Sequence, residues 1–341
     1  MKSFSLNAVY LLLSLLAVVV FGCQNKDTAE NIKPAAKTAN VKKPDTTALN
    51  VTADYDRRME ALRVTDSLGK WQFKTPYPLP GAILPYKRVV AFYGNLYSKR
   101  MGILGELPKD EMLKKLKEEV AAWTAADSTI PVIPALHYIA ITAQGKPGKD
   151  GMHRQRMPHK QIDTIVSWAK ELDGLVFLDV QIGQSTVPAE VATLTNYLKL
   201  PQVHLALDPE FAMQEGKVPG RKIGTLSAAA INTAIDTLQK IVRENNLPPK
   251  ILVVHRFTQG MVTDYKDIKT CPEVQVVMHM DGWGGKALKR SAYRMAIYRE
   301  PVQFAGFKLF YKNDIKKPGS VMLTPEELLR LTPKPVYIQY Q

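Results

Sequence analysis

Short apolar segments alternate with amphipathic segments along most of the chain, and this alternation constrains the fold more than any other feature. Eight apolar runs of strand length occur between residues 88 and 340, and most of them precede a segment with helical periodicity. Such alternation is typical of a parallel sheet with helices on its outside. Eight units of this kind match a (β/α)8 barrel. The sequence therefore predicts an α/β fold, a TIM-like (β/α)8 barrel.

The positions of the elements follow from this pattern. The predicted strands are 88–93, 131–139, 174–180, 203–207, 250–254, 274–280, 303–311 and 336–340. The predicted helices are 109–125, 159–172, 189–198, 227–245, 261–268, 286–298 and 325–331. Because no helix follows the last strand, we expect a further helix at 53–69 to cover that gap. The alternative is an open doubly wound sheet, but no Gly-x-Gly-x-x-Gly motif follows a strand.

The N-terminus has the pattern of an export signal. Lys2 precedes an apolar run over 9–21, which is too short for a comfortable membrane span. The run ends at Gly22-Cys23, which resembles the lipobox of bacterial lipoproteins and implies that Cys23 is acylated. The alternative is a secreted protein with a free thiol. Cys271 is the only other cysteine, so we expect no internal disulfide and interpret Cys271 as a small apolar residue beside a strand.

Three regions follow from these features. We predict a lipoprotein signal peptide at 1–22, a disordered tether at 23–50 and the barrel domain at 51–341. The tether region is rich in Lys, Asn, Thr and Pro and has no apolar period. The expected location is the bacterial cell envelope, with the chain anchored to a membrane through Cys23. The net charge of +14 suits an acidic glycan, an anionic membrane or nucleic acid, but no segment is typical of a nucleic-acid module, so we expect no such partner.

Polar side chains stand at the carboxyl ends of several predicted strands, where the active sites of such barrels lie. In chain order they are His137, Tyr138, Asp179, Gln181, Asp208, Glu210, His255, Arg256, His279 and Asp281. Asp208 and Glu210 follow an apolar strand that Pro209 should end, because proline cannot donate to a ladder. A carboxylate in this position needs partners, and its pKa is open to tuning. The structural alternative is a salt bridge or loop cap at the barrel mouth.

Paired carboxylates at a barrel rim suit glycoside hydrolysis, in which one protonates the leaving oxygen and the other acts as nucleophile or base. The candidates are Asp179, Asp208, Glu210 and Asp281, and our preferred pair is Glu210 with Asp179 or Asp281. Aromatic rings at the rim can stack on sugar faces. The predicted substrate-binding residues are Tyr93, His137, Tyr138, Gln181, His255, Arg256 and Trp283.

Two other functions fit the same residues. A non-catalytic envelope protein that binds a glycan or a partner needs the same rim. A metal-dependent hydrolase would use ligand types present at the rim, namely His137, His255, His279, Asp179 and Asp281. No His-x-His or His-Glu-x-x-His spacing occurs, and the leading interpretation includes no metal or other cofactor. A serine nucleophile motif and a phosphate-binding loop are also missing from the sequence. We interpret His204 as a core residue and the basic run 153–156 as solvated loop charges, with an anion site as the alternative.

Several blocks resemble a family of secreted bacterial barrel proteins without an assigned activity. They lie between about 88 and 290 and include Phe92-Tyr93-Gly94, Leu178-Asp179-Val180-Gln181, Leu205 to Phe211, His255-Arg256-Phe257 and Asp281-Gly282-Trp283-Gly284. This resemblance implies the fold and the rim. The architecture also resembles glycoside hydrolase barrels, although the seventh strand ends Lys308-Leu309-Phe310-Tyr311 without the glutamate that many of those families carry there. Nor is the chitinase-like acidic pattern met near Asp179.

Overall fold

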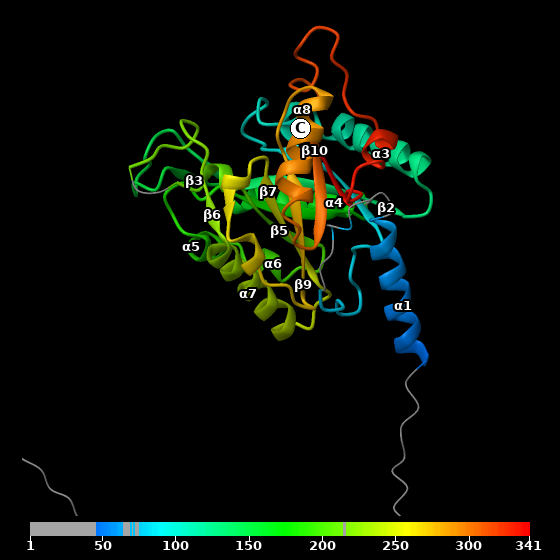
Figure 1. Cartoon of the computed structure of the whole chain (residues 1–341). Coiled ribbons are helices and arrows are strands. Elements are labelled where there is room, and N and C mark those ends of the chain that lie inside the picture. Colours follow the sequence, from blue (N-terminus) through cyan, green and yellow to red (C-terminus); the bar gives the residue numbers. More distant parts are fainter. Residues whose placement is uncertain (1–45, 64–68, 70, 72–74, 214–215) are drawn as a thin grey trace, which may run out of the picture. The chain divides into compact units, whose positions relative to one another are not determined.

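The fold is a closed parallel barrel. The computed structural model describes residues 46–63, 69, 71, 75–213 and 216–341. Among these residues the main sheet has nine strands, of which eight run parallel and form the barrel (Figure 1). The barrel strands are β1 (Arg88–Gly94), β2 (Val132–Ala143), β4 (Leu175–Val180), β5 (Val203–Leu207), β7 (Lys250–Arg256), β9 (Val274–Met280), β10 (Phe304–Leu309) and β11 (Tyr337–Tyr340).

The strand order confirms the predicted barrel. It runs β1-β11-β10-β9-β7-β5-β4-β2, and pairing of β1 with β2 closes the ring. The ninth strand, β3 (Arg154–Arg156), pairs antiparallel with the end of β2 and extends it beyond the barrel. A separate short pair joins β6 (Leu226–Ser227) to β8 (Val262–Thr263). The open doubly wound alternative is therefore excluded by the β1–β2 pairing.

Helices lie outside the strands, close to the predicted positions. They are α1 (Thr46–Ala61), α2 (Ile103–Glu106), α3 (Lys109–Ala126), α4 (His159–Lys170), α5 (Val187–Ala192), α6 (Thr195–Leu198), α7 (Ala228–Glu244), α8 (Lys286–Tyr293) and α9 (Pro325–Leu328). The helix expected after the third strand is split into α5 and α6, and a π-helical turn, Arg294–Tyr298, continues α8. Two 3-10 turns and β8 replace the helix expected at 261–268.

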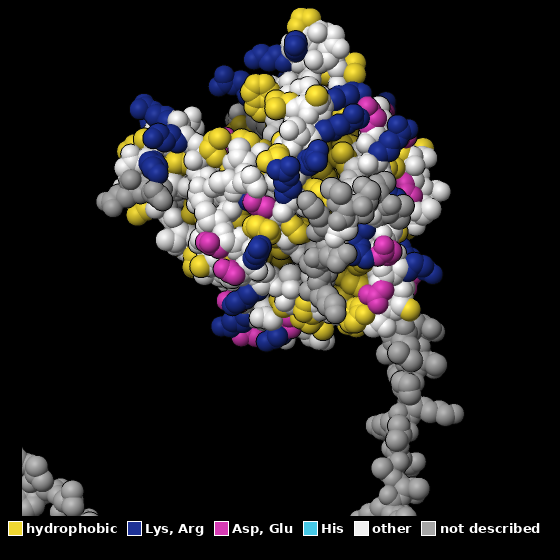
Figure 2. All heavy atoms as spheres, viewed as in Figure 1, with side chains coloured by type: hydrophobic (Ala, Val, Ile, Leu, Met, Phe, Trp, Pro, Cys, Tyr) yellow, Lys and Arg dark blue, Asp and Glu magenta, His cyan; other side chains and the backbone are white. Residues whose placement is uncertain are grey.

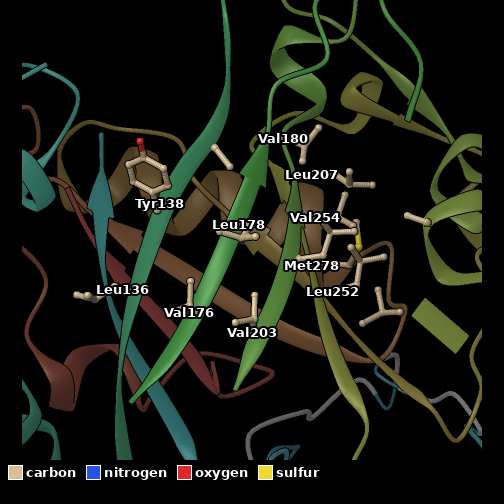
Figure 3. Close-up of a cluster of buried hydrophobic side chains, with 14 of the residues drawn as sticks. Leu136, Tyr138, Val176, Leu178, Val180, Val203, Leu207, Leu252, Val254 and Met278 are labelled. Atoms are coloured by element: carbon tan, nitrogen blue, oxygen red, sulfur yellow. The ribbon is translucent and has the colours of Figure 1, made fainter. Parts of the chain in front are cut away.

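Alternation along each strand separates two apolar layers. On β7, Ile251 and Val253 face the barrel interior, whereas Leu252 and Val254 face the surrounding helices. Figure 3 shows the outer layer, in which Leu178, Val180, Leu207 and Val254 project from neighbouring strands. Because successive side chains point to opposite faces of a strand, the same parity determines which side chains reach the interior near the carboxyl ends.

The segment before β1 closes the amino end of the barrel. Leu62 and Leu84 pack with the apolar side chains of the barrel interior. The Leu62 carbonyl accepts a hydrogen bond from Lys334 N at 2.9 Å. The Gln275 side chain binds the Leu84 carbonyl oxygen at 2.5 Å. We expected the N-terminal helix to cover the side of the last strand. That prediction was wrong, because the chain directly after this helix packs at the amino end of the barrel.

Helix α3 covers the outer face beside the last strand instead. Trp123 of α3 is fully buried, and its Nε1 atom donates to the Tyr340 hydroxyl of β11 at 2.9 Å. The outward-facing Phe92 of β1 belongs to the same cluster. Helix α3 therefore covers part of the outer face beside β1 and the end of β11.

The N-terminal predictions fall mostly outside the described residues. The signal peptide, Cys23 and the tether up to residue 45 are not covered, whereas 46–50 belong to α1 rather than to a tether. None of the described helices has the length and apolar character needed to cross a bilayer. On the face shown in Figure 2, Lys and Arg side chains gather over the region of α3 and α8, in keeping with the basic composition.

Candidate functional site

A cavity of about 660 Å³ opens at the carboxyl ends of the barrel strands. Its walls combine polar and aromatic side chains that several separate strands supply. The polar residues used below are Tyr93, Gln181, Asp208, Glu210, Asp281 and Lys308, and the aromatic ones are Phe211, Phe257, Trp283 and Phe310. The cavity therefore lies at the end of the barrel where the active sites of such folds are found.

Asp208 and Glu210 reach the cavity by a local turn. The strand β5 ends at Leu207, and a 3-10 turn, Pro209–Phe211, follows. Oδ1 of Asp208 caps this turn by accepting a hydrogen bond from Glu210 N at 3.1 Å, while Oδ2 accepts from Gln181 Nε2 at 3.3 Å. A continued strand would place both acids on one face, but the 3-10 turn positions Glu210 instead.

The two acids have raised pKa values for related reasons. Burial raises the pKa of Asp208 well above its ordinary value; His255 opposes this shift, and neighbouring carboxylates add to it. Burial also raises the pKa of Glu210, and the nearby charge of Asp281 raises it further. Glu210 is half-buried, and its carboxyl group makes no hydrogen bond to the described residues. It is therefore free to contact a ligand and is biased toward keeping its proton.

Asp281 links the cavity to the interior of the barrel. It follows β9, lines the cavity and accepts a hydrogen bond at Oδ2 from His255 Nδ1 at 3.0 Å. Its Oδ1 atom has no hydrogen-bond partner among the described residues. The carboxylate thus has one oxygen fixed and one oxygen unengaged.

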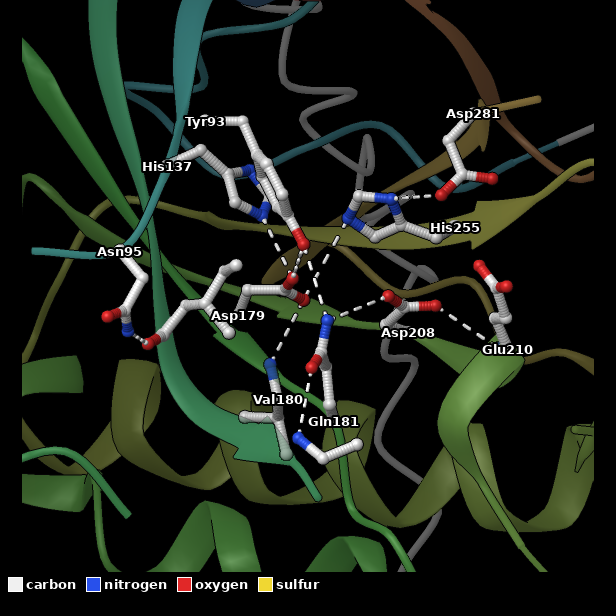
Figure 4. Close-up of polar contacts among 12 residues, drawn as sticks. Tyr93, Asn95, His137, Asp179, Val180, Gln181, Asp208, Glu210, His255 and Asp281 are labelled. Atoms are coloured by element: carbon white, nitrogen blue, oxygen red, sulfur yellow. Dashed lines mark hydrogen bonds and ion pairs between the residues drawn. The ribbon is translucent and has the colours of Figure 1, made fainter. Parts of the chain in front are cut away.

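Asp179 lies below the cavity rather than in its wall. It is fully buried and accepts hydrogen bonds from the Tyr93 hydroxyl at 3.1 Å and from Val180 N at 3.0 Å (Figure 4). Burial acts to raise its pKa, but His255 and His137 outweigh that effect and lower the pKa to about 2. Asp179 is therefore an ionised interior group shielded from the cavity.

His137 and His255 lie beside Asp179, whereas His204 lies elsewhere in the barrel interior. Burial lowers the pKa of His137 to about 4, whereas for His255 the charges of Asp179 and Asp281 outweigh burial and raise the pKa. His279 packs its ring 5.1 Å from that of His255. As predicted, His204 lies deeper, where its Nδ1 accepts from Ile251 N at 3.0 Å and satisfies a core backbone group.

Three side chains of metal-ligand type, those of His137, Asp179 and His255, converge below the cavity and form what we call the interior cluster. Ligand atoms of His137, Asp179 and His255 all lie within 4.8 Å of one another. These residues come from β2, β4 and β7, which explains why no local spacing in the sequence marks them. Among the described residues they form the one group of nitrogen and oxygen donors close enough to hold a metal ion.

Lys308 is a cavity residue that our sequence analysis did not assign to the site. Its Nζ atom lies 3.6 Å from the centroid of the Tyr93 ring, and the side chain is almost fully buried. Burial lowers its pKa, while the carboxylates around it act in the opposite direction. A charged residue at an interior position of an otherwise apolar strand is the signal that would have identified it.

Two predicted site residues point away from the cavity. Tyr138 faces the surrounding helices and contacts Gln161, and Arg256 also faces outward, where it binds the Val262 carbonyl at 3.1 Å and pairs with Glu300. Both follow interior residues by one position, so strand parity sends them to the opposite face. The assignment of Tyr138 and Arg256 to substrate binding was therefore wrong.

The basic run also has a structural explanation. Arg154 and Arg156 both bind the carboxylate of Glu190, each through Nε at 2.8 Å. Glu190 is fully buried, and its pKa is lowered because these contacts outweigh burial. The two arginines hold the extension of β2 against α5, so they are neither free loop charges nor an open anion site.

Comparisons with known proteins are remote. Neither protein-family models nor curated proteins match this chain, so the resemblance to secreted bacterial barrel proteins remains a prediction. Among solved structures, a cellulase, Cel5C_n, is 13% identical with a TM-score of 0.39, covering 74% of this chain and 75% of that chain. A Bacillus subtilis mannanase, BCman, is 10% identical with a TM-score of 0.37, covering 84% and 85%. A ruminal GH26 endo-beta-1,4-mannanase is 10% identical with a TM-score of 0.36, covering 80% and 65%. Likeness at this level supports no conclusion about activity.

Proposed function

We propose that this protein hydrolyses a glycosidic bond in the cavity, with Glu210 as the general acid and Asp281 as the nucleophile or base. The proposal rests on which of four neighbouring acids line the cavity and have a carboxyl oxygen without a hydrogen-bond partner. Both oxygens of Asp208 accept hydrogen bonds, and Asp179 lies outside the cavity wall. Glu210 and Asp281 remain as the two cavity acids with a carboxyl oxygen that has no hydrogen-bond partner among the described residues.

The surroundings of these acids suit their assigned roles. A general acid must hold its proton until the leaving oxygen departs, and burial beside Asp281 favours the protonated form of Glu210. Asp281 is held by His255, which fixes the orientation of its carboxylate. Glycoside hydrolysis uses two carboxyl groups, one that protonates the leaving oxygen and one that acts as nucleophile or base.

The rest of the cavity suits a polar ring with apolar faces. Its volume of about 660 Å³ lies within the usual range for small-molecule sites, about 300–1,000 Å³. Trp283 is 57% exposed at the wall, where its ring is available for stacking on a sugar. Lys308 supplies a cation that can contact hydroxyl or carboxylate groups of a ligand.

The test is a glycan panel with matched variants. The purified protein is incubated with bacterial and host glycans, and both binding and released products are measured for the native chain, Glu210→Gln and Asp281→Asn. Asp236→Asn is the control, because Asp236 only pairs with Lys269 on the exterior at 3.0 Å. We expect both cavity variants to bind without turnover while the control retains activity. Binding without turnover by the native chain would instead support a non-catalytic glycan-binding protein.

The proposal includes attachment to the bacterial cell envelope through Cys23. It is supported by the apolar run at 9–21 and the Gly22-Cys23 pair that ends it. A hydrolase held outside the cytoplasm would meet polysaccharides of the wall or the surroundings.

A further inference from the structure

The interior cluster below the cavity is built from three converging side chains. His137 Nε2 lies 3.8 Å from Oδ2 of Asp179, and His255 Nε2 lies 3.8 Å from Oδ1 of the same carboxylate. All three side chains are fully buried. Figure 4 shows both imidazole rings directed at the carboxylate from two sides.

The separations within the cluster do not correspond to hydrogen bonds. A hydrogen bond between nitrogen and oxygen has a length of about 2.7–3.2 Å. Accordingly, the Nε2 atoms of His137 and His255 have no hydrogen-bond partner among the described residues. Buried polar atoms are paired in most proteins, so two such nitrogens facing one carboxylate call for an explanation.

Each imidazole is also held from behind. His137 Nδ1 lies 2.6 Å from the Tyr337 hydroxyl, and His255 Nδ1 lies 3.0 Å from Oδ2 of Asp281. If both Nδ1 atoms carry the proton and donate it to these oxygens, both Nε2 lone pairs point at Asp179. Metal-ligating histidines are commonly oriented in this way by a carboxylate or another oxygen on the second nitrogen.

We propose that His137, Asp179 and His255 bind one divalent transition-metal ion of the Zn²⁺ type. Nitrogen and carboxylate ligands lie about 2.0–2.2 Å from Zn²⁺, so two atoms 3.8 Å apart can both contact one ion at an angle of about 130°. The ion satisfies both unpaired nitrogens and neutralises the buried carboxylate. Tyr93 and Val180 already donate to that carboxylate and orient it.

The site goes beyond the proposed hydrolysis, because its ligands are not part of the cavity wall. Tyr93, which lines the cavity, stands between the cavity and Asp179. The ion orients Asp281 through the imidazole of His255 without contacting a substrate. Loss of the metal and loss of the cavity acids are therefore separable by measurement.

The test measures Zn²⁺ binding by the complete chain after treatment with a chelator. Equilibrium dialysis with elemental analysis should give one Zn²⁺ per chain. Co²⁺, used as a spectroscopic substitute, should develop the visible absorption of a low-coordinate site. His137→Asn and His255→Asn remove the Nε2 atoms, and we expect each to weaken Zn²⁺ binding at least about 100-fold. Tyr337→Phe, which releases His137 Nδ1, should weaken it about 10- to 100-fold.

The matched control is the double variant His153→Asn with His159→Asn. These two histidines lie outside the barrel and are the surface residues most able to bind metal nonspecifically. The control should keep one equivalent and the same affinity, and circular dichroism should show that every variant is folded. The proposal is overturned if the control loses the metal while His137→Asn retains it, or if Co²⁺ keeps the spectrum of the hydrated ion. Either result would exclude an ion held between the two Nε2 atoms and Asp179.

Discussion

His255 Nδ1 lies 3.0 Å from Oδ2 of Asp281, and this contact joins the interior cluster to the cavity wall. The His255 ring therefore faces a different acid with each of its two nitrogens. Its Nδ1 side fixes a carboxylate proposed to act on a substrate, whereas its Nε2 side faces Asp179 at 3.8 Å. The two sides can be tested separately by substitution.

The first prediction separates the two nitrogens of His255. An asparagine at this position places an amide N–H near the former Nδ1 and leaves nothing at Nε2, whereas a glutamine can reach the Nε2 position. We expect His255→Asn to retain most of the kcat while losing metal affinity. His255→Gln should lose more of the kcat, because Asp281 is no longer held. Steady-state kinetics and dialysis on the same samples measure both effects, and equal kcat losses in the two variants would contradict the assignment.

The second prediction concerns pH dependence. The pKa of Glu210 is raised by burial and by Asp281, while Lys308 lowers it. A general acid works in its protonated form, so activity should fall as pH rises through the pKa of Glu210. Lys308→Met removes the cation and should move this alkaline limb of kcat/KM to higher pH. A shift to lower pH would exclude Glu210 as the group that controls the limb.

The third prediction concerns stability. Glu190 is ionised between Arg154 and Arg156, and its folded pKa lies below the value in the unfolded chain. Its stabilising contribution is therefore complete above the unfolded pKa and is lost as pH falls through the folded pKa. We expect Glu190→Gln to lower the free energy of unfolding by about 1–3 kcal/mol at neutral pH. Denaturant titrations of both proteins across acid pH should show the difference shrinking, and a difference independent of pH would contradict this explanation.

The fourth prediction tests the exposed ring at the cavity wall. Trp283→Ala should raise the KM for a glycan by about 2- to 10-fold, since an aromatic contact is worth about 0.5–1.5 kcal/mol. The side chain is 57% exposed, so the Tm should stay the same. A parallel loss of Tm and affinity would show that Trp283 packs rather than binds.

The fifth prediction concerns the proposed anchor. Cys23→Ala should move the protein from the membrane fraction to the soluble fraction when it is produced in a bacterial host that processes lipoproteins. Cys271→Ala is the matched control and should leave the distribution unchanged. Incorporation of a labelled fatty acid into the native chain but not into Cys23→Ala provides a second measurement. Membrane association of Cys23→Ala would exclude this cysteine as the anchor.

The strands and their parity could be predicted because they depend on local pattern. The apolar run ending at Leu207 and the proline after it place Asp208 at a strand end before any tertiary contact is known. The same parity rule, applied to Tyr138 and Arg256, would have assigned both to the outer face.

Other features required the closed ring. Asp179 and Asp281 have similar positions at strand ends, yet one is sealed below Tyr93 and the other lines the cavity. The convergence of His137 with His255 depends on strands far apart in the sequence and on barrel closure. Lys308 faces four carboxylates only after the ring is complete. Such relationships cannot be obtained from spacing along the chain.

Closure of the amino end of the barrel determines how ligands enter and leave the cavity. Leu62 and Leu84 close that end, and side chains fill the interior above them in the part of the chain that the structure describes. A molecule that enters at the carboxyl ends of the strands therefore has no exit along the barrel axis. Product must leave by the side on which substrate arrived, so any partner that covered this side would block entry and release together.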